Sequence, residues 1–140
     1  MVRISNQKLV ELLMKNSRTP YVELASTLGV SETAVRKRMK ALERSGAIRR
    51  YTIDADPKKL GFGAQAMVGI DTLPERYIFV IERLRSMKEV VSLYSSSGDH
   101  MIVAECWFDD SGNLSGFIRK LESVEGVTRV CPAILNERIK

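Results

Sequence analysis

Residues 24–46 read LASTLGVSETAVRKRMKALERSG, and this stretch decides the fold of the first part of the chain. Gly29 is suited to end one helix, and Ser31, two residues later, is suited to cap the start of another. The second helix then carries an apolar stripe at helical spacing, made of Val35, Met39 and Leu42. Two helices joined by so short a glycine turn predict a helix-turn-helix.

A further helix is expected before this pair, over SNQKLVELLMKNS, with Ser5 as its cap. Its buried face is expected to hold Leu9, Leu12 and Leu13. The helix that ends at Gly29 is expected over TPYVELASTLG, with Thr19 as cap and Pro20 at the first helical position. Its buried stripe is expected to consist of Val22, Ala25 and Leu28.

The remaining chain alternates strand and helix patterns. After Gly46, AIRRYTIDADP predicts a strand that leads into the linker DADPKKLGFG. Four more strands are expected over residues 65–71, 90–96, 100–108 and 127–139, and two helices over 74–87 and 112–123. The order βαββαβ predicts a ferredoxin-like unit with both helices on one face of an antiparallel sheet.

The predicted fold class is therefore α+β, with a winged three-helix helix-turn-helix followed by the ferredoxin-like unit. The expected boundaries are 1–50 for the DNA-binding domain, 51–61 for the strand and linker, and 62–140 for the second domain. Of the 140 residues, those up to Gly61 include 13 Lys and Arg against 6 Asp and Glu, and the rest include 9 against 11. A basic module joined to a slightly acidic one is typical of a protein whose first part meets a polyanion.

Composition favours a water-soluble cytoplasmic protein, because no apolar run approaches the roughly 18 residues that cross a bilayer. The N-terminal MVRISNQKLVELL becomes polar too early for a signal peptide. Cys106 and Cys131 have neither a CxxC partner nor a neighbouring histidine, so we expect reduced core cysteines and no metal site. We also expect no membrane partner.

The helix after Ser31 is expected to have a cationic side opposite its apolar stripe. The outward positions are Thr33, Arg36, Lys37, Lys40 and Arg44. A helix of about 14 residues is about 21 Å long and fits the major groove of B-DNA, where we expect Arg36 and Lys37 to read bases. The groups expected to contact phosphates are Tyr21, Ser31, Thr33, Lys40, Arg49 and Arg50. Taken alone, such charges are more typical of a solvated helix face. The glycine turn, the caps and the basic segment together favour DNA.

These residues also resemble a known family. The stretch LASTLGVSETAVRKRMKALERSGAIRRYTIDADPKKLGF resembles the N-terminal half of the Lrp/AsnC (feast/famine) transcription regulators, through the helix-turn-helix, the RMKALERSGAI segment and the linker that ends at Leu60 and Gly61. The likeness continues to the C-terminal VEGVTRVCPAILNERIK. It implies a prokaryotic, archaeal regulator that dimerises through its C-terminal domains, assembles into octamers, binds a palindromic operator in double-stranded DNA and responds to an amino acid.

The stretch SSSGDH, residues 95–100, holds the only histidine, directly after an aspartate and three serines. A serine hydrolase needs its three groups to converge in space, which neighbours in one short turn rarely do, so no catalytic site is expected and the protein is not expected to be an enzyme. Ser-Gly-Asp is ordinary chemistry for a hairpin turn. The resemblance adds that regulators of this family carry Gly-Asp-x-Asp here, lining an amino-acid pocket between subunits.

Gly98 and Asp99 match that pattern, His100 takes the variable position, and Met101 replaces the second acidic residue. Asp99 is expected to bind the effector's ammonium group, and the backbone from Ser96 to Gly98 its carboxylate. One missing carboxylate weakens the case for a lysine- or arginine-type effector and leaves room for glutamine. By position in the family, the expected effector site comprises Tyr77, Ser95, Ser96, Ser97, Gly98, Asp99, His100, Met101, Arg119, Val130, Cys131, Pro132, Ala133 and Ile134.

Two other readings stay open at this point. An architectural DNA-compacting protein without an effector would share the basic module but show little sequence preference. A C-terminal domain that only sets the oligomeric state would bind no ligand. A ferredoxin-like enzyme or metal carrier has no supporting set of residues in the sequence.

Overall fold

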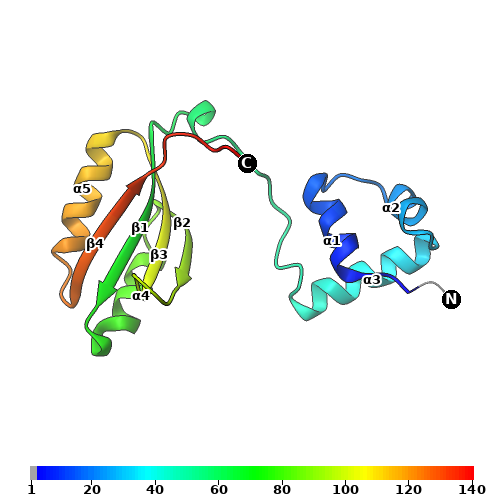
Figure 1. Ribbon diagram of the computed structural model, residues 1–140, viewed down its shortest axis with the longest axis horizontal. Coiled ribbons are helices and arrows are strands. Elements are labelled where there is room, and N and C mark those ends of the chain that lie inside the picture. Colours follow the sequence, from blue (N-terminus) through cyan, green and yellow to red (C-terminus); the bar gives the residue numbers. More distant parts are fainter. Residues whose placement is uncertain (1–2) are drawn as a thin grey trace. The chain divides into compact units, whose positions relative to one another are not determined.

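The structure, a computed structural model, describes residues 3–140, and it consists of two compact units. The first runs to Asp54 and contains three helices, and the second runs from Ala55 to Lys140 and contains a four-stranded sheet with two α-helices (Figure 1). The predicted linker, residues 51–61, spans the boundary between them. Each unit has its own hydrophobic core and is described separately.

The first unit contains helices α1 (Asn6–Lys15), α2 (Tyr21–Leu28) and α3 (Glu32–Ser45). Two predicted caps are confirmed, because the hydroxyl of Ser5 accepts a hydrogen bond from the Lys8 amide at 3.3 Å and that of Ser31 one from the Ala34 amide at 3.1 Å. Gly29 ends α2 with a positive φ of 68°, which glycine adopts without strain. The buried core of the unit consists of Leu9, Leu24, Ala25, Val35, Met39 and Leu42.

Helix α2 differs from its prediction at two points. Pro20 occupies the cap position itself, and the Thr19 hydroxyl donates instead to the Asn16 carbonyl at 2.7 Å, so Thr19 is not the cap. Val22 is 62% exposed, and Leu24 takes its expected place in the core. The apolar residues of so short a helix can form a buried side either with Val22 or with Leu24. Packing against α1 and α3 buries Leu24 and Ala25.

The segment after α3 was expected to form a strand, and that prediction is wrong for the described residues. Residues 47–56 have no regular secondary structure, and Tyr51 and Ile53 remain 62% and 83% exposed. Extended propensity alone does not make a strand, because the backbone also needs a neighbouring edge to pair with. A short 3-10 helix, η1 (Lys58–Leu60), follows.

The second unit has strands β1 (Ala64–Thr72), β2 (Val90–Ser95), β3 (Ile102–Phe108) and β4 (Val127–Ile134). All neighbouring strands are antiparallel, in the order β2-β3-β1-β4. The helices are α4 (Tyr77–Arg85), preceded by the 3-10 turn η2 (Pro74–Arg76), and α5 (Ser111–Glu122). The βαββαβ ferredoxin-like prediction is therefore confirmed. Strand β4 stops at Ile134 rather than near Ile139, because its partner β1 begins at Ala64 and offers no edge beyond that point.

The two faces of this sheet are different. Alternate strand residues, among them Val68, Ile70 and Ile102, are fully buried beneath Val80 and Leu84 of α4 and beneath Leu114, Phe117 and Leu121 of α5. The intervening residues face away from the helices, and we call this side the open face. Register places the following residues there: Met67, Gly69 and Asp71 of β1; Val103 and Glu105 of β3; Tyr94 of β2; and Arg129, Cys131 and Ala133 of β4.

The two cysteines lie on opposite faces and neither forms a disulfide. Cys106 is fully buried in the core, where burial, followed by the charges of Glu89 and Glu105, raises the pKa of its thiol to about 12. Cys131 is half-buried on the open face, so only Cys106 is a core residue as predicted. Within residues 3–140, each helix is too short or too polar to span a lipid bilayer.

Candidate DNA-binding surface and candidate ligand site

Helix α3 presents a row of cations to solvent. Val35, Met39 and Leu42 anchor one side in the core, which turns the opposite side outward. The exposed residues on that side are Thr33, Arg36, Lys37, Lys40 and Arg44. Ser31 and the unpaired amides of the first turn stand at the start of the same side. This arrangement suits the phosphates and base edges of a major groove.

Arg36 is held in place before any DNA arrives. Its Nη2 atom lies 3.0 Å from Oε1 of Glu32, one turn earlier, and its guanidinium stands 5.1 Å from the centre of the Tyr21 ring. Tyr21, expected from sequence to contact phosphate, therefore also orients an expected base reader. No salt bridge is formed by Lys37 or Lys40 within residues 3–140, so these two ammonium groups remain free for an anionic partner.

Arg49 and Arg50 are exposed in the segment that follows α3. This segment returns toward α3 at Tyr51, whose hydroxyl donates to Oε1 of Glu43 at 2.6 Å. That hydrogen bond to the Glu43 carboxylate, and to a smaller extent burial, raises the pKa of Tyr51 to about 12. The hydrogen bond between Tyr51 and Glu43 thus holds the segment that carries both arginines against α3.

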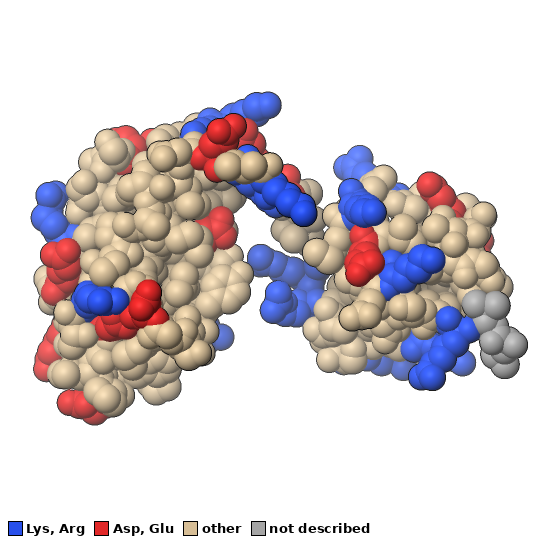
Figure 2. Space-filling model, in the orientation of Figure 1, with Lys and Arg blue, Asp and Glu red and all other residues tan. Residues whose placement is uncertain are grey.

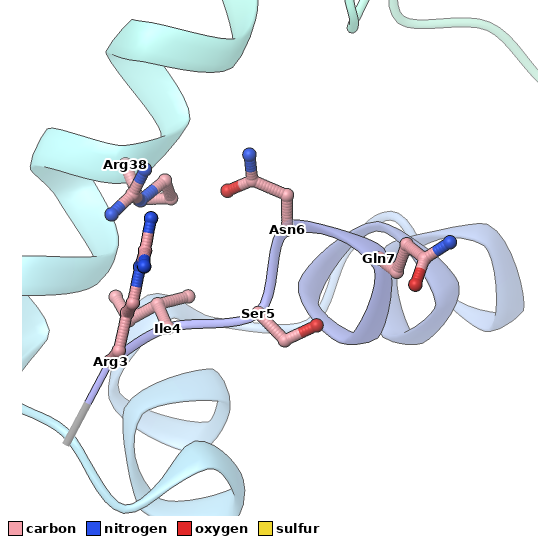
Figure 3. A pocket seen from close by; sticks show the side chains of 6 residues that line it. All are labelled: Arg3, Ile4, Ser5, Asn6, Gln7 and Arg38. Carbon is pink, nitrogen blue, oxygen red and sulfur yellow. The ribbon is translucent and has the colours of Figure 1, made fainter.

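Arg3 and Arg38 form a second basic group that sequence patterns did not single out. They line a hollow of about 380 Å³ at the start of α1, together with Ile4, Ser5, Asn6 and Gln7. Figure 3 shows the two guanidinium groups directed toward each other, Arg38 from the helix and Arg3 from the chain before α1. On the face shown in Figure 2, Lys and Arg predominate over Asp and Glu in this unit, whereas the two signs are interspersed in the other. Arg38 could have been noted from the sequence as a further positive charge on α3.

The predicted hairpin turn connects β2 and β3. Ser96 donates its amide to the Met101 carbonyl at 2.8 Å, and Gly98 has a φ of 105°, which favours glycine. Ser95 to Asp99 are exposed, while His100 and Met101 are half-buried. Asp99 therefore has a carboxylate available to solvent, as its expected role requires.

Asp71, at the end of β1, organises this hairpin, and sequence reasoning missed it. Its Oδ1 accepts the Met101 amide at 2.9 Å, and its Oδ2 lies 3.1 Å from His100 Nδ1 and 3.0 Å from Arg129 Nε. Arg129 also donates from Nη2 to the Asp99 carbonyl at 2.9 Å. We call Asp71, His100 and Arg129 the hairpin network. The sequence did hold a signal for this role, because Asp71 places a carboxylate in an otherwise apolar strand, where it needs hydrogen-bond partners.

The network keeps Asp71 ionised. Burial alone would raise the pKa of this carboxyl, but the hydrogen bonds from Met101 and His100 and the charges of His100 and Arg129 outweigh it and hold the pKa below its usual value. The side chain of Asp71 is only 18% exposed. The hairpin is therefore fixed by a charged acceptor shared among three donors.

His100 pairs with Asp71 and not with its sequence neighbour Asp99. Its ring lies on the open face against Gly69, where an added Cβ would come within 2.3 Å of ring carbon Cδ2. The ring donates from Nδ1 to Asp71, and within the described chain it makes no hydrogen bond to a serine of the 95–97 run. The geometry agrees with a turn rather than a hydrolytic triad.

The remaining residues of the expected effector site lie elsewhere in the unit. Val130 to Ile134 run along β4, at the opposite edge of the sheet from β2, with Cys131 and Ala133 on the open face. Tyr77 begins α4 and packs against the core, and Arg119 is exposed near the end of α5. Within one chain, Arg129 of β4 joins the hairpin by donating a hydrogen bond from Nη2 to the Asp99 carbonyl. Across residues 3–140, no cluster of three or more His, Cys, Asp or Glu is arranged to hold a metal ion.

The first unit is a helix-turn-helix with an exposed cationic third helix. The second is a ferredoxin-like unit with a charged hairpin. Together they define a two-domain DNA-binding regulator with a ligand domain. Residues 5–43 match the AsnC-type helix-turn-helix domain and residues 65–140 match the Lrp/AsnC ligand binding domain. The chain belongs to the Lrp/AsnC family of transcriptional regulators, as its sequence predicted.

Similar proteins agree with this assignment. The transcriptional regulator LrpA of Pyrococcus abyssi is 48% identical over 141 residues, covering 100% of both chains, and LrpA of Pyrococcus horikoshii is 50% identical over 133 residues, covering 94% of each. Among solved structures, AsnC of E. coli is 27% identical, with a TM-score of 0.81 over 99% of this chain and 95% of that one. A regulator of Neisseria meningitidis, solved as a complex with L-Met, shares the fold at 24% identity, with a TM-score of 0.84 over 99% of this chain and 93% of that one.

Proposed function

We propose that the protein binds specific palindromic operators and that an amino acid, bound at the hairpin, changes how it does so. It acts as a regulator and not as an enzyme, and it works where the chromosome lies, in the cytoplasm. The observation that carries the first part is the exposed cationic row on a capped, firmly packed α3. The second part rests on the ligand-domain match and on the exposed Asp99, whose backbone carbonyl is held by Arg129.

At the DNA, α3 enters the major groove with Arg36 and Lys37 toward base edges. Arg36 is suited to a guanine because Tyr21 and Glu32 already limit its orientation. Phosphate contacts come from the remaining expected residues, Tyr21, Ser31, Thr33, Lys40, Arg49 and Arg50, and the Arg3 and Arg38 pair extends them. A palindromic site needs two such helices, so the working unit is a dimer, which the family resemblance extends to an octamer.

The DNA proposal is tested by selecting bound duplexes from a random library and footprinting the preferred sequence. We expect inverted half-sites spaced by about one helical turn, and we expect Arg36→Ala with Lys37→Ala to lower affinity for that sequence by about 100-fold. Lys15→Ala, on α1, is the matched control. If the double variant keeps the affinity and the base preference, α3 is not the reading helix. If no sequence is preferred at all, the architectural alternative holds.

At the hairpin, the effector's ammonium binds Asp99 and its carboxylate binds the Ser96 to Gly98 amides. Asp71 is already saturated by its three donors, and Met101 supplies no charge, so Asp99 is left as the acceptor for a single cationic group. A neutral side chain such as that of glutamine suits this site better than lysine or arginine. The second wall, expected from Tyr77, Arg119 and Val130 to Ile134, requires a neighbouring subunit.

Binding alters regulation only if the effector prefers one assembly state over another. Calorimetric titration with each of the twenty amino acids, followed by sedimentation with and without the amino acid that binds, tests this. Asp99→Ala should abolish binding and leave the sedimentation of the free protein unchanged, while Glu105→Ala on the same face should bind normally. If no amino acid binds to the wild-type protein, the second domain serves assembly alone.

A further inference from the structure

A basic pocket lies on the helix side of the second unit, on the face of the sheet opposite the hairpin network. Arg76, Phe79 and Arg83 follow one another at helical spacing along η2 and α4 and form one wall. Lys120, Ser123 and Glu125, at the end of α5 and in the turn before β4, form the other. The cavity has a volume of about 220 Å³. Neither the DNA-binding surface nor the hairpin uses any of these residues.

The guanidinium of Arg76 is fixed in this pocket yet lacks hydrogen bonds on one edge. It stacks over Phe79, with 4.1 Å between Cζ and the ring centre, and its side chain passes so close to Gly126 that an added Cβ there would lie 2.4 Å from Arg76 Cβ. Its Nε is buried without a hydrogen-bond partner among the described residues. Its Nη2 lies 3.8 Å from Oε2 of Glu125, too far for a hydrogen bond.

Nε is covered by the surrounding chain, so Nη2, beside the exposed Glu125, is the donor through which this guanidinium can bind an oxyanion. A guanidinium stacked in this way loses little freedom when an anion binds, and it gains a charge-assisted hydrogen bond from Nη2. Glu125 occupies the position of such an anion only weakly, because its side chain is 88% exposed and free to move away. Arg76 is therefore organised for a partner that the chain itself does not supply.

Charge selects the kind of partner. Three cations, Arg76, Arg83 and Lys120, face one carboxylate, Glu125, so the lining carries a net charge of +2. A phosphate group is close to a dianion near neutral pH and presents oxygens in several directions at once, which suits donors from two helices. The cavity is smaller than the roughly 300–1,000 Å³ of pockets for drug-sized ligands, so the occupant is small.

We propose that this pocket binds a small phosphate-bearing anion, with Nη2 of Arg76, Arg83 and Lys120 supplying the donors and the positive charge. Phe79 forms the apolar floor under the guanidinium. The site is independent of the amino-acid site proposed above, and either can fail without the other.

The test is calorimetric titration of the full-length protein with inorganic phosphate, against sodium chloride at equal ionic strength. We expect phosphate to bind and chloride not to bind. The double variant Arg83→Ala with Lys120→Ala should weaken binding by about tenfold, and Glu125→Gln, which removes the internal competitor, should strengthen it by about threefold. Lys88→Ala removes a cation beyond the far end of α4 and should leave the affinity within twofold.

Two results would overturn the proposal. In the first, phosphate gives no more heat than chloride, or Lys88→Ala weakens binding as much as the double variant does, which would mean that general positive charge attracts the anion. In the second, phosphate does not bind but the double variant lowers affinity for duplex DNA and flattens its salt dependence. The pocket would then contact the DNA backbone instead of a small ligand.

Discussion

Helix α3 and the β2–β3 hairpin present their polar groups in opposite ways. On α3 the cations project separately from a helix that the core holds in place, and Lys37 and Lys40 are free within residues 3–140. At the hairpin, Asp71, His100 and Arg129 come from three different segments, and His100 and Arg129 both depend on Asp71 as a hydrogen-bond acceptor. A change on α3 should therefore alter binding without altering the fold, whereas a change in the hairpin network should alter local order first.

The largest effect is expected for Asp71→Ala. Removing the shared acceptor leaves the Met101 amide, His100 and Arg129 without their partner, and we expect a loss of about 2 kcal/mol in the free energy of unfolding of the second unit. Denaturant unfolding followed by the fluorescence of Trp107, the single tryptophan, measures it. Asp109→Ala, an exposed change of the same kind, is the control. Equal stability of the two variants would show that the network does not hold the hairpin.

The next effect concerns Lys40→Ala on α3, where Lys40 is expected to contact phosphate. Losing one ion contact should lower DNA affinity by about tenfold and reduce the slope of log K against log salt by about 0.9, with equal loss for all sequences. Thermal unfolding should not change, because Lys40 is exposed. Lys15→Ala is the matched control. A change in base preference would contradict the assignment of Lys40 to the backbone.

The hairpin network should also respond to acid. The folded pKa of Asp71 lies below its ordinary value of 3.8, so the stability that it contributes is complete above that value and is lost as pH falls through the lower, folded pKa. The difference in unfolding free energy between wild type and Asp71→Asn should thus shrink as pH falls below about pH 4. A difference that grows below about pH 4 would show that the sign is reversed.

The smallest effect is expected for Tyr51→Phe, which removes the hydrogen bond to Glu43 beside α3. Because Tyr51 is 62% exposed, the loss in stability should be about 0.5 kcal/mol. The tether to Arg49 and Arg50 should loosen, so DNA affinity should fall by about twofold. Fluorescence anisotropy with a labelled duplex measures this, and Ile53→Ala, also exposed, provides the comparison. A tenfold loss would mean that Tyr51 contacts DNA itself.

The parts of the molecule that sequence predicted correctly are those set by near neighbours. Ser5, Ser31 and Gly29 act within one turn of chain, and Met39 and Leu42 recur at the helical period. The errors arose where the outcome depends on contacts with elements distant in sequence. Packing against α1 and α3 buries Leu24 rather than Val22, and the strand expected after Gly46 has no strand edge to pair with. Asp71 and Arg129 were missed because only the β1–β4 register places them opposite each other, 58 residues apart.

The contact between Gly69 and His100 ties two positions together in the way they tolerate substitution. Any side chain at position 69 would enter the space of the imidazole ring, so Gly69→Ala should be accepted in a chain that carries His100→Ala and rejected in one that keeps the histidine. The two positions are therefore coupled in the substitutions they tolerate, although they lie 31 positions apart in the sequence.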